Sequence, residues 1–214
     1  MRKKSLILVA VCFALIVGAF SASAFNPDDL SRFLNTGSCR GGDLSKADFS
    51  ALNLSHAHLE YANLSCAILN FANLRGAHLE GANLTGAYLT GAQLQGAHLQ
   101  RAKLNCAILH TTDLSGANLT GASFTWQLRQ DPFFRHGNYR NVNIRGANLS
   151  DAILVGANLV GANLVGANFD GANLRNARLR QVDLHGVWLS AIQLRSVNIY
   201  GAVDVFGAVV PIFI

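Results

Sequence analysis

Charged residues are scarce in this sequence: Asp, Glu, Lys and Arg make up only 14% of its 214 residues, whereas 50% are hydrophobic. A disordered chain combines low hydrophobicity with high net charge, so this composition excludes disorder as the main state. The length predicts one or two domains, with enough apolar material to form a core.

Catalytic motifs are absent as well. The sequence contains no P-loop, no G-x-S-x-G nucleophile elbow and no H-E-x-x-H zinc motif. His58-Leu59-Glu60 matches the H-x-E half of the zinc deaminase signature, but the P-C-x-x-C half is missing. We therefore expect a protein that is not an enzyme and that needs no cofactor.

The N-terminal segment, positions 1–24, lacks acidic side chains and has the features of an export signal. Positions 2–4 are basic, positions 5–20 are apolar and positions 22–24 are small, so we expect cleavage between Ala24 and Phe25. An uncleaved anchor is the alternative, but the apolar run is shorter than the roughly 20 residues that span a bilayer. Cleavage would place the protein in a periplasm, a lumen or the extracellular space, with no stable membrane span.

The excess of positive charge depends on the same segment. The whole chain has 17 Lys and Arg against 12 Asp and Glu, a formal net charge of +5. Without the three basic residues at positions 2–4, 14 basic residues face 12 acidic ones, and the net charge falls to +2. A basic surface for nucleic acid loses its main support, and we expect no nucleic-acid partner.

The rest of the sequence repeats every five residues. From Leu44 to Phe124 every fifth residue is Leu or Phe, and the pattern resumes from Ile144 to Ile199. Ala usually stands two positions earlier, with a polar residue between them. Neither the 3.6-residue period of a helix nor the 2-residue period of a strand fits this spacing. We expect the Ala and Leu positions to face inward, with a core that includes Leu64, Leu84, Leu104, Leu149 and Leu164.

A longer period of 20 residues indicates how the chain coils. Gly recurs two positions after Leu, as at Gly86, where a type II turn requires positive φ. Four such corners would close a coil of 20 residues, and His58, His78 and His98 recur at that period. At a strand spacing of about 4.8 Å, residues 40–200 would form eight stacked coils, a rod of roughly 38 Å.

The unit Ala-(Asn/Asp)-Leu-x-x resembles the motif of the pentapeptide-repeat protein family over most of the chain after residue 40. The resemblance implies an all-β fold, a right-handed quadrilateral β-helix. It implies less about function, because members include DNA-mimicking gyrase-binding proteins, exported or lumenal proteins of unknown role, and effectors. Residues 34–44 are similar to the leading segment of exported members, which often carry C-x-x-C there; this chain has Cys39 but Gly42 in the second position.

Both ends of the repeat differ from its middle. Asn26 can cap a short helix, and the apolar face of that helix, with Phe33, would cover the first coil. The C-terminal tail is almost wholly apolar, which indicates either a cap on the last coil or an interface, such as that of a homodimer. The chain thus divides into a signal (1–24), a capping helix with a leading segment (25–39), a first β-helix block (40–124), an interruption (125–140), a second block (141–200) and an apolar tail (201–214).

The interruption keeps the phase of the repeat, since Phe124 and Ile144 are 20 positions apart. Residues 125–140 could form one degraded coil or leave the rod as a loop, and loops on a rigid scaffold often carry binding residues. Aromatic and Arg side chains are favoured at protein interfaces. A tolerated loop without a binding role is the alternative. The candidates for interaction are Trp126, Arg129, Phe133, Phe134 and Arg135.

One outward column is a candidate for metal chemistry. His58, His78 and His98 would align on one face beside Glu60 and Glu80, where neighbouring imidazoles could share a cation. Solvated stacking is the simpler interpretation, because nothing in the repeat encloses the site. We therefore predict no metal site, and keep the shared cation as the alternative.

Cysteine is too sparse for a network of cross-links. Cys12 lies within the signal, which leaves Cys39, Cys66 and Cys106. An odd number means that at least one thiol is unpaired or pairs between chains. Cys66 and Cys106 would lie two coils apart, about 9.6 Å, which is beyond disulfide reach.

These features predict an exported, non-enzymatic β-helical scaffold or protein-binding rod, with a protein as its partner. The alternative that the resemblance implies is a DNA-mimicking gyrase binder. That role needs a negative surface and a cytoplasmic location, so the signal and the net charge of +2 after cleavage disfavour it.

Overall fold

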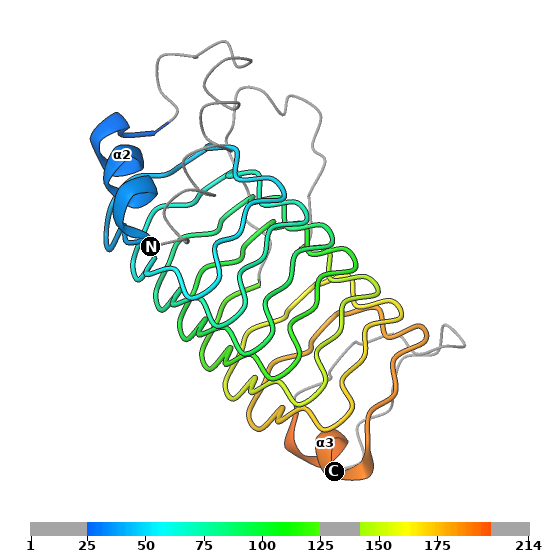
Figure 1. Ribbon diagram of the computed structural model, residues 1–214. Helices are drawn as coiled ribbons and strands as arrows, with labels where there is room; N and C mark the ends of the chain where they lie inside the picture. Colours follow the sequence, from blue (N-terminus) through cyan, green and yellow to red (C-terminus); the bar gives the residue numbers. More distant parts are fainter. Residues whose placement is uncertain (1–24, 125–141, 198–214) are drawn as a thin grey trace.

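A computed structural model of the chain describes residues 25–124 and 142–197. In Figure 1 these residues form a rod of stacked coils, with helix α2 (Pro27–Thr36) at one end and helix α3 (Ala191–Ser196) at the other. Within these ranges, neither helix is long and apolar enough to cross a membrane.

The coils are joined by isolated parallel β-bridges between residues 20 positions apart. Asn63 bridges to Asn83, where Leu64 N–H donates to Asn83 C=O at 2.8 Å and Asn83 N–H donates to Ala62 C=O at 2.9 Å. Bridging positions fall every five residues, which makes four sides per coil. The five-residue pattern therefore folds as the β-helix expected from the sequence.

Two side chains of each five-residue unit point into the rod. They belong to the Ala and to the Leu two positions later, because alternate residues of an extended segment face the same way. The polar residue between them faces outward. The five core residues named above, Leu64, Leu84, Leu104, Leu149 and Leu164, are each at most 1% exposed.

The outward polar residue also closes the corner that follows it. Asn63 Oδ1 accepts a hydrogen bond from Ser65 N–H at 3.2 Å, and Asp113 Oδ1 accepts one from Ser115 N–H at 3.0 Å. Asn and Asp side chains form such local turns readily, because their oxygen reaches the N–H two residues on. This explains why Asn and Asp are common at the position before Leu.

Each corner contains a residue in the left-handed region of backbone space. Ala62 N–H donates to Leu59 C=O at 3.1 Å, and Tyr61, the third residue of this turn, has a φ of 59°. Seven of these residues are followed by Gly on the next coil; at Gly81, for example, a Cβ would lie 2.6 Å from the ring of Tyr61. The pairs are His56–Gly76, Tyr61–Gly81, Cys66–Gly86, Phe71–Gly91, Arg101–Gly121, Thr111–Gly146 and Asp151–Gly171.

Replacing Gly81 by Ala should lower the free energy of unfolding more than replacing Gly96 by Ala. Both glycines have a φ near 65°, so both substitutions carry the left-handed penalty of about 1–2 kcal/mol. Only at Gly81 must a neighbouring side chain, Tyr61, also move; a Cβ on Gly96 meets nothing within 4 Å. Urea unfolding of the two variants measures the difference, and equal losses would contradict the packing of Tyr61 over Gly81.

The rod passes directly from the first block to the second. Ile108 bridges to Asn143 and Ser123 to Asn158, so the spacing rises from 20 to 35 and three whole units are skipped. These bridges stack the second block directly on the first, so of the two alternatives for the interruption they do not fit one degraded coil within the stack. The proposed interaction residues Trp126, Arg129, Phe133, Phe134 and Arg135 lie outside the described residues.

The second block also ends before residue 200. The bridges end at Asp183, and α3 follows, with Ser190 and Gln193 forming a reciprocal capping box at its start. Gln193 is buried and its Nε2 donates to Phe169 C=O and Ala172 C=O, at 2.8 and 3.0 Å. The described rod thus has six to seven coils. The expected eight counted residues 125–140, which lie outside the described residues, and a continuation of the repeat past residue 187, where α3 follows instead.

At the other end, α2 lies against the first coil. Asn26 Oδ1 accepts from Asp28 N–H at 2.9 Å, and Gly37 ends the helix with a φ of 72°. Phe33 is buried, and its ring meets that of Phe49 edge to face at a centroid distance of 5.6 Å. The helix therefore covers apolar surface of the first coil.

Gly42 allows this close approach. A Cβ at position 42 would contact Cys39 Sγ and would lie 2.8 Å from Asp29 Cγ and 2.9 Å from Arg32 Nη2. Cys39 itself is buried at an inward position that Leu occupies on later coils. Burial raises the pKa of the Cys39 thiol, and a hydrogen bond from Arg32 offsets part of that effect.

Candidate functional site

The candidate site is a column of outward side chains on one face of the rod. Ser38, His58, His78 and His98 succeed one another there, each bridged to the next. The rings of His58 and His78 are stacked at 4.8 Å with an angle of 11°, and those of His78 and His98 at 4.7 Å with an angle of 6°. The coil spacing therefore brings the three sequence-predicted histidines together.

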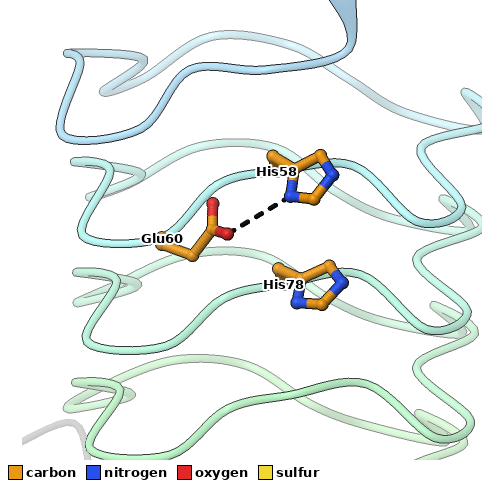
Figure 2. Close-up of side chains that lie close together, drawn as sticks. All are labelled: His58, Glu60 and His78. Atoms are coloured by element: carbon orange, nitrogen blue, oxygen red, sulfur yellow. Dashed lines mark hydrogen bonds and ion pairs between the residues drawn. The ribbon is translucent and has the colours of Figure 1, made fainter.

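Glutamates stand beside these rings because they lie two residues further along the same extended segments. Figure 2 shows His58 above His78, with Glu60 facing Nδ1 of His58. Oε1 of Glu60 lies 3.2 Å from that nitrogen. Oε1 of Glu80 lies 3.4 Å from Nδ1 of His78 and 3.8 Å from Nδ1 of His98. We call His58, Glu60, His78, Glu80 and His98 the His/Glu ladder.

The upper part of the His/Glu ladder already contains a cation. Nη2 of Arg40 lies 2.9 Å from Oε1 of Glu60, and its Nε donates to Oε2 at 3.0 Å. The same Nη2 lies 3.3 Å from Nδ1 of His58. Burial raises the pKa of Glu60, but hydrogen bonds from its own N–H, from His58 and from Arg40 outweigh burial and hold that pKa below its ordinary value.

The lower part of the His/Glu ladder is less well satisfied. Oε2 of Glu80 is buried and has no hydrogen-bond partner, and neither has Oε1 of Gln100 on the following coil. Within the described part of the chain, Glu80 pairs with His78 and His98 but with no Lys or Arg. A buried carboxylate oxygen without a partner is costly and unusual in a folded protein.

Sequence reasoning missed Arg40. Arg40, Glu60 and Glu80 are spaced by 20 positions, so the coil period contained the signal that they share a column. The cysteines do not join this site: Cys39 lies near α2, and no disulfide involves Cys39, Cys66 or Cys106.

A second surface lies at the α3 end of the rod. A pocket of about 690 Å³ is lined there by side chains that include Trp188 and Gln193. Trp188 is 90% exposed and Ile192 is 82% exposed, so two large apolar side chains border this pocket at the surface. The predicted interface tail, residues 201–214, lies outside the described residues, and its role stays a prediction.

Comparison with known proteins identifies the repeat. A family model described as pentapeptide repeats matches in eight copies, over residues 43–81, 82–121, 143–181 and 157–195. No curated protein matches the chain.

Solved structures of pentapeptide repeat proteins are similar. A trypsin-treated variant of QnrB1, a plasmid-mediated fluoroquinolone resistance protein, is 18% identical with a TM-score of 0.51, over 72% of this chain and 70% of that one. HetL of the cyanobacterium Nostoc, involved in heterocyst differentiation regulation, is 30% identical over 80% of this chain and 86% of that one, with a TM-score of 0.32. A protein of the Arabidopsis thaliana thylakoid lumen is 26% identical over 74% and 73%, with a TM-score of 0.29.

Proposed function

We propose that this chain, which belongs to the pentapeptide-repeat family, is a non-enzymatic β-helical scaffold. In this role it binds another protein outside the cytosol. The inward positions of the described coils are filled mainly by Ala, Leu and Phe, which carry no chemistry. Any recognition by the rod therefore depends on its outward columns.

The observation that carries this proposal is the regular order of those outward columns. Asn83 Nδ2 donates to Asn63 Oδ1 at 3.2 Å, and Asn63 Nδ2 donates to Asp43 Oδ1 at 2.9 Å. Side chains that are already held by their neighbours lose little freedom when a partner binds. A flat, pre-ordered polar face is therefore suited to protein recognition.

We expect the mature chain to bind one protein, saturably, in the compartment to which it is exported. Cross-linking followed by affinity capture would identify that partner, and a titration with the purified partner would measure the affinity. A variant without residues 125–139 serves as the matched control, because the coils stack without that segment. Retained binding would assign recognition to the rod, and lost binding to the segment; turnover of a small molecule without any protein partner would overturn the proposal.

The gyrase-binding alternative has a direct test. The similarity to QnrB1 at 18% identity shows the fold alone. The mature protein, with a net charge of +2, should leave DNA supercoiling by purified gyrase unchanged. Inhibition of supercoiling would favour the DNA mimic over the scaffold.

The exported form should begin at Phe25. Two contacts near this position support the proposal. Phe25 packs against the core, and Asn26 N–H donates a hydrogen bond to Asp43 C=O at 3.1 Å. Cleavage after Ala24 would thus leave the new N-terminus anchored on the rod. Intact-mass measurement of the protein released from cells tests this, and a chain that stays membrane-bound with residues 1–24 present would support the uncleaved anchor instead.

A further inference from the structure

We infer that His78, Glu80 and His98 form a binding site for one divalent transition-metal ion, with zinc as the best match. The site would use Nδ1 of each histidine and a carboxylate oxygen of Glu80, with water completing the coordination. This goes beyond the scaffold role, which requires no metal.

The carboxylate of Glu80 lies at a suitable distance from both imidazoles for a shared zinc ion. Zinc binds His nitrogen and carboxylate oxygen at about 2.0–2.2 Å in a tetrahedron, so neighbouring ligand atoms lie roughly 3.4 Å apart. Oε1 of Glu80 lies 3.4 Å from Nδ1 of His78 and 3.8 Å from Nδ1 of His98. All three ligand atoms lie within 4.8 Å of one another. The two distances from Glu80 are thus close to the edge of a zinc tetrahedron, and the two imidazoles must turn for their nitrogens to converge on one ion.

Charge favours this set over its neighbour. His58, Glu60 and His78 have a similar arrangement, but the guanidinium of Arg40 already occupies that position and pairs with Glu60. Glu80 has no such partner among the described residues, and its Oε2 is buried without a hydrogen bond. A cation is therefore present in the upper half of the His/Glu ladder and missing in the lower half. A metal ion beside Glu80 would supply it.

Binding must change the orientation of the rings. His78 and His98 are stacked almost in parallel, whereas a metal ion lies in the plane of each imidazole that binds it. Both side chains are partly exposed, at 35% and 44%, so they can rotate without disturbing the core. When the metal binds, the rings of His78 and His98 should therefore leave their stacked arrangement, and their two Nδ1 atoms should point toward the same ion.

Titration of the intact chain with zinc chloride tests the inference. We expect one strongly bound zinc ion per chain and a rise in melting temperature. His78→Asn and His98→Asn should each weaken binding by at least about tenfold, because loss of an outer-shell contact alone has an effect of that size. Asn is compatible with the fold, since Asn118 and Asn173 occupy the same column.

The controls separate this site from other zinc-binding groups. His58→Asn should leave the zinc affinity unchanged, because His58 belongs to the half that Arg40 occupies. Glu80→Gln should weaken binding with little change in the stability of the zinc-free protein, because Gln keeps an oxygen that can face Nδ1 of His78 and the other carboxylate oxygen has no hydrogen bond to lose. The ¹⁵N shift of Nδ1 in His78 should report direct coordination. Equal zinc affinity in His78→Asn and the parent, or an equal loss in His58→Asn, would overturn the assignment.

Discussion

Replacing Leu84 by Ala should lower the free energy of unfolding by about 2–5 kcal/mol. Leu84 is 1% exposed and lies in one inward column with Leu64 and Leu104, on the coils before and after it. Truncation removes buried apolar surface and leaves a cavity, because both adjoining coils are held by inter-coil hydrogen bonds and cannot close over it. Equilibrium unfolding in guanidinium chloride measures the loss.

Thr85→Ala is the matched control for this experiment. Thr85 follows Leu84 directly but is only partly buried, at the start of a corner. Substitutions at such surface positions usually change stability by no more than about 0.5 kcal/mol. A loss at Thr85 as large as that at Leu84 would contradict the register in which Ala and Leu face inward.

Deletion of residues 125–139 should leave the rod folded and equally stable. The deletion removes the three units that the coil stacking skips, and it restores the spacing between Ile108 and Asn143 to 20. Phe124 would then be followed by Arg140 and by Asn141-Val142-Asn143-Ile144, so the next inward residues fall at their usual intervals. Circular dichroism and thermal unfolding of the deletion variant test this expectation.

Deletion of residues 125–140, one position more, should have the opposite effect. Phe124 and Ile144 would be four positions apart instead of five, which is too short for the corner. Closing the gap would need a slip of one residue, and such a slip turns inward side chains outward. Each Leu exposed in this way forfeits about 1.5–3 kcal/mol, so the second block should lose its fold. Equal stability of the two deletion variants would contradict the direct stacking of the second block on the first.

The periodicity of the sequence was enough to predict most of the rod. Because Leu recurs every fifth residue and Ala stands two before it, the inward set that includes Leu84 follows from geometry, and the 20-residue recurrence of His58, His78 and His98 predicts the column that they share. The limits of the rod were harder to predict. Leu continues at the same spacing through Leu189 and Leu194, although α3 begins at Ala191. The position of α3 depends on contacts with an earlier coil, which periodicity does not report.

The sequence was enough to predict that the three histidines share a column, but not how the charges around them are paired. Stacking of the histidines follows from the coil spacing, but the difference between Glu60 and Glu80 depends on a single long side chain, that of Arg40, which lies one coil earlier. The interruption was ambiguous for a different reason. The skipped segment contains a whole number of five-residue units, so the phase of the pattern is the same with or without it.

The pairing of bulky corner residues with glycines gives the rod a direction. The ring of Tyr61 needs a glycine on the coil that follows, at Gly81, and Phe71 needs Gly91 in the same way. A coil that carries such a side chain can be followed by some coils and not by others, so the coils are not interchangeable units. Gene duplications or designed recombinants that place a residue other than Gly on the coil after Tyr61 or Phe71 should therefore destabilise the rod, whereas exchanges that keep these glycines in place should be tolerated.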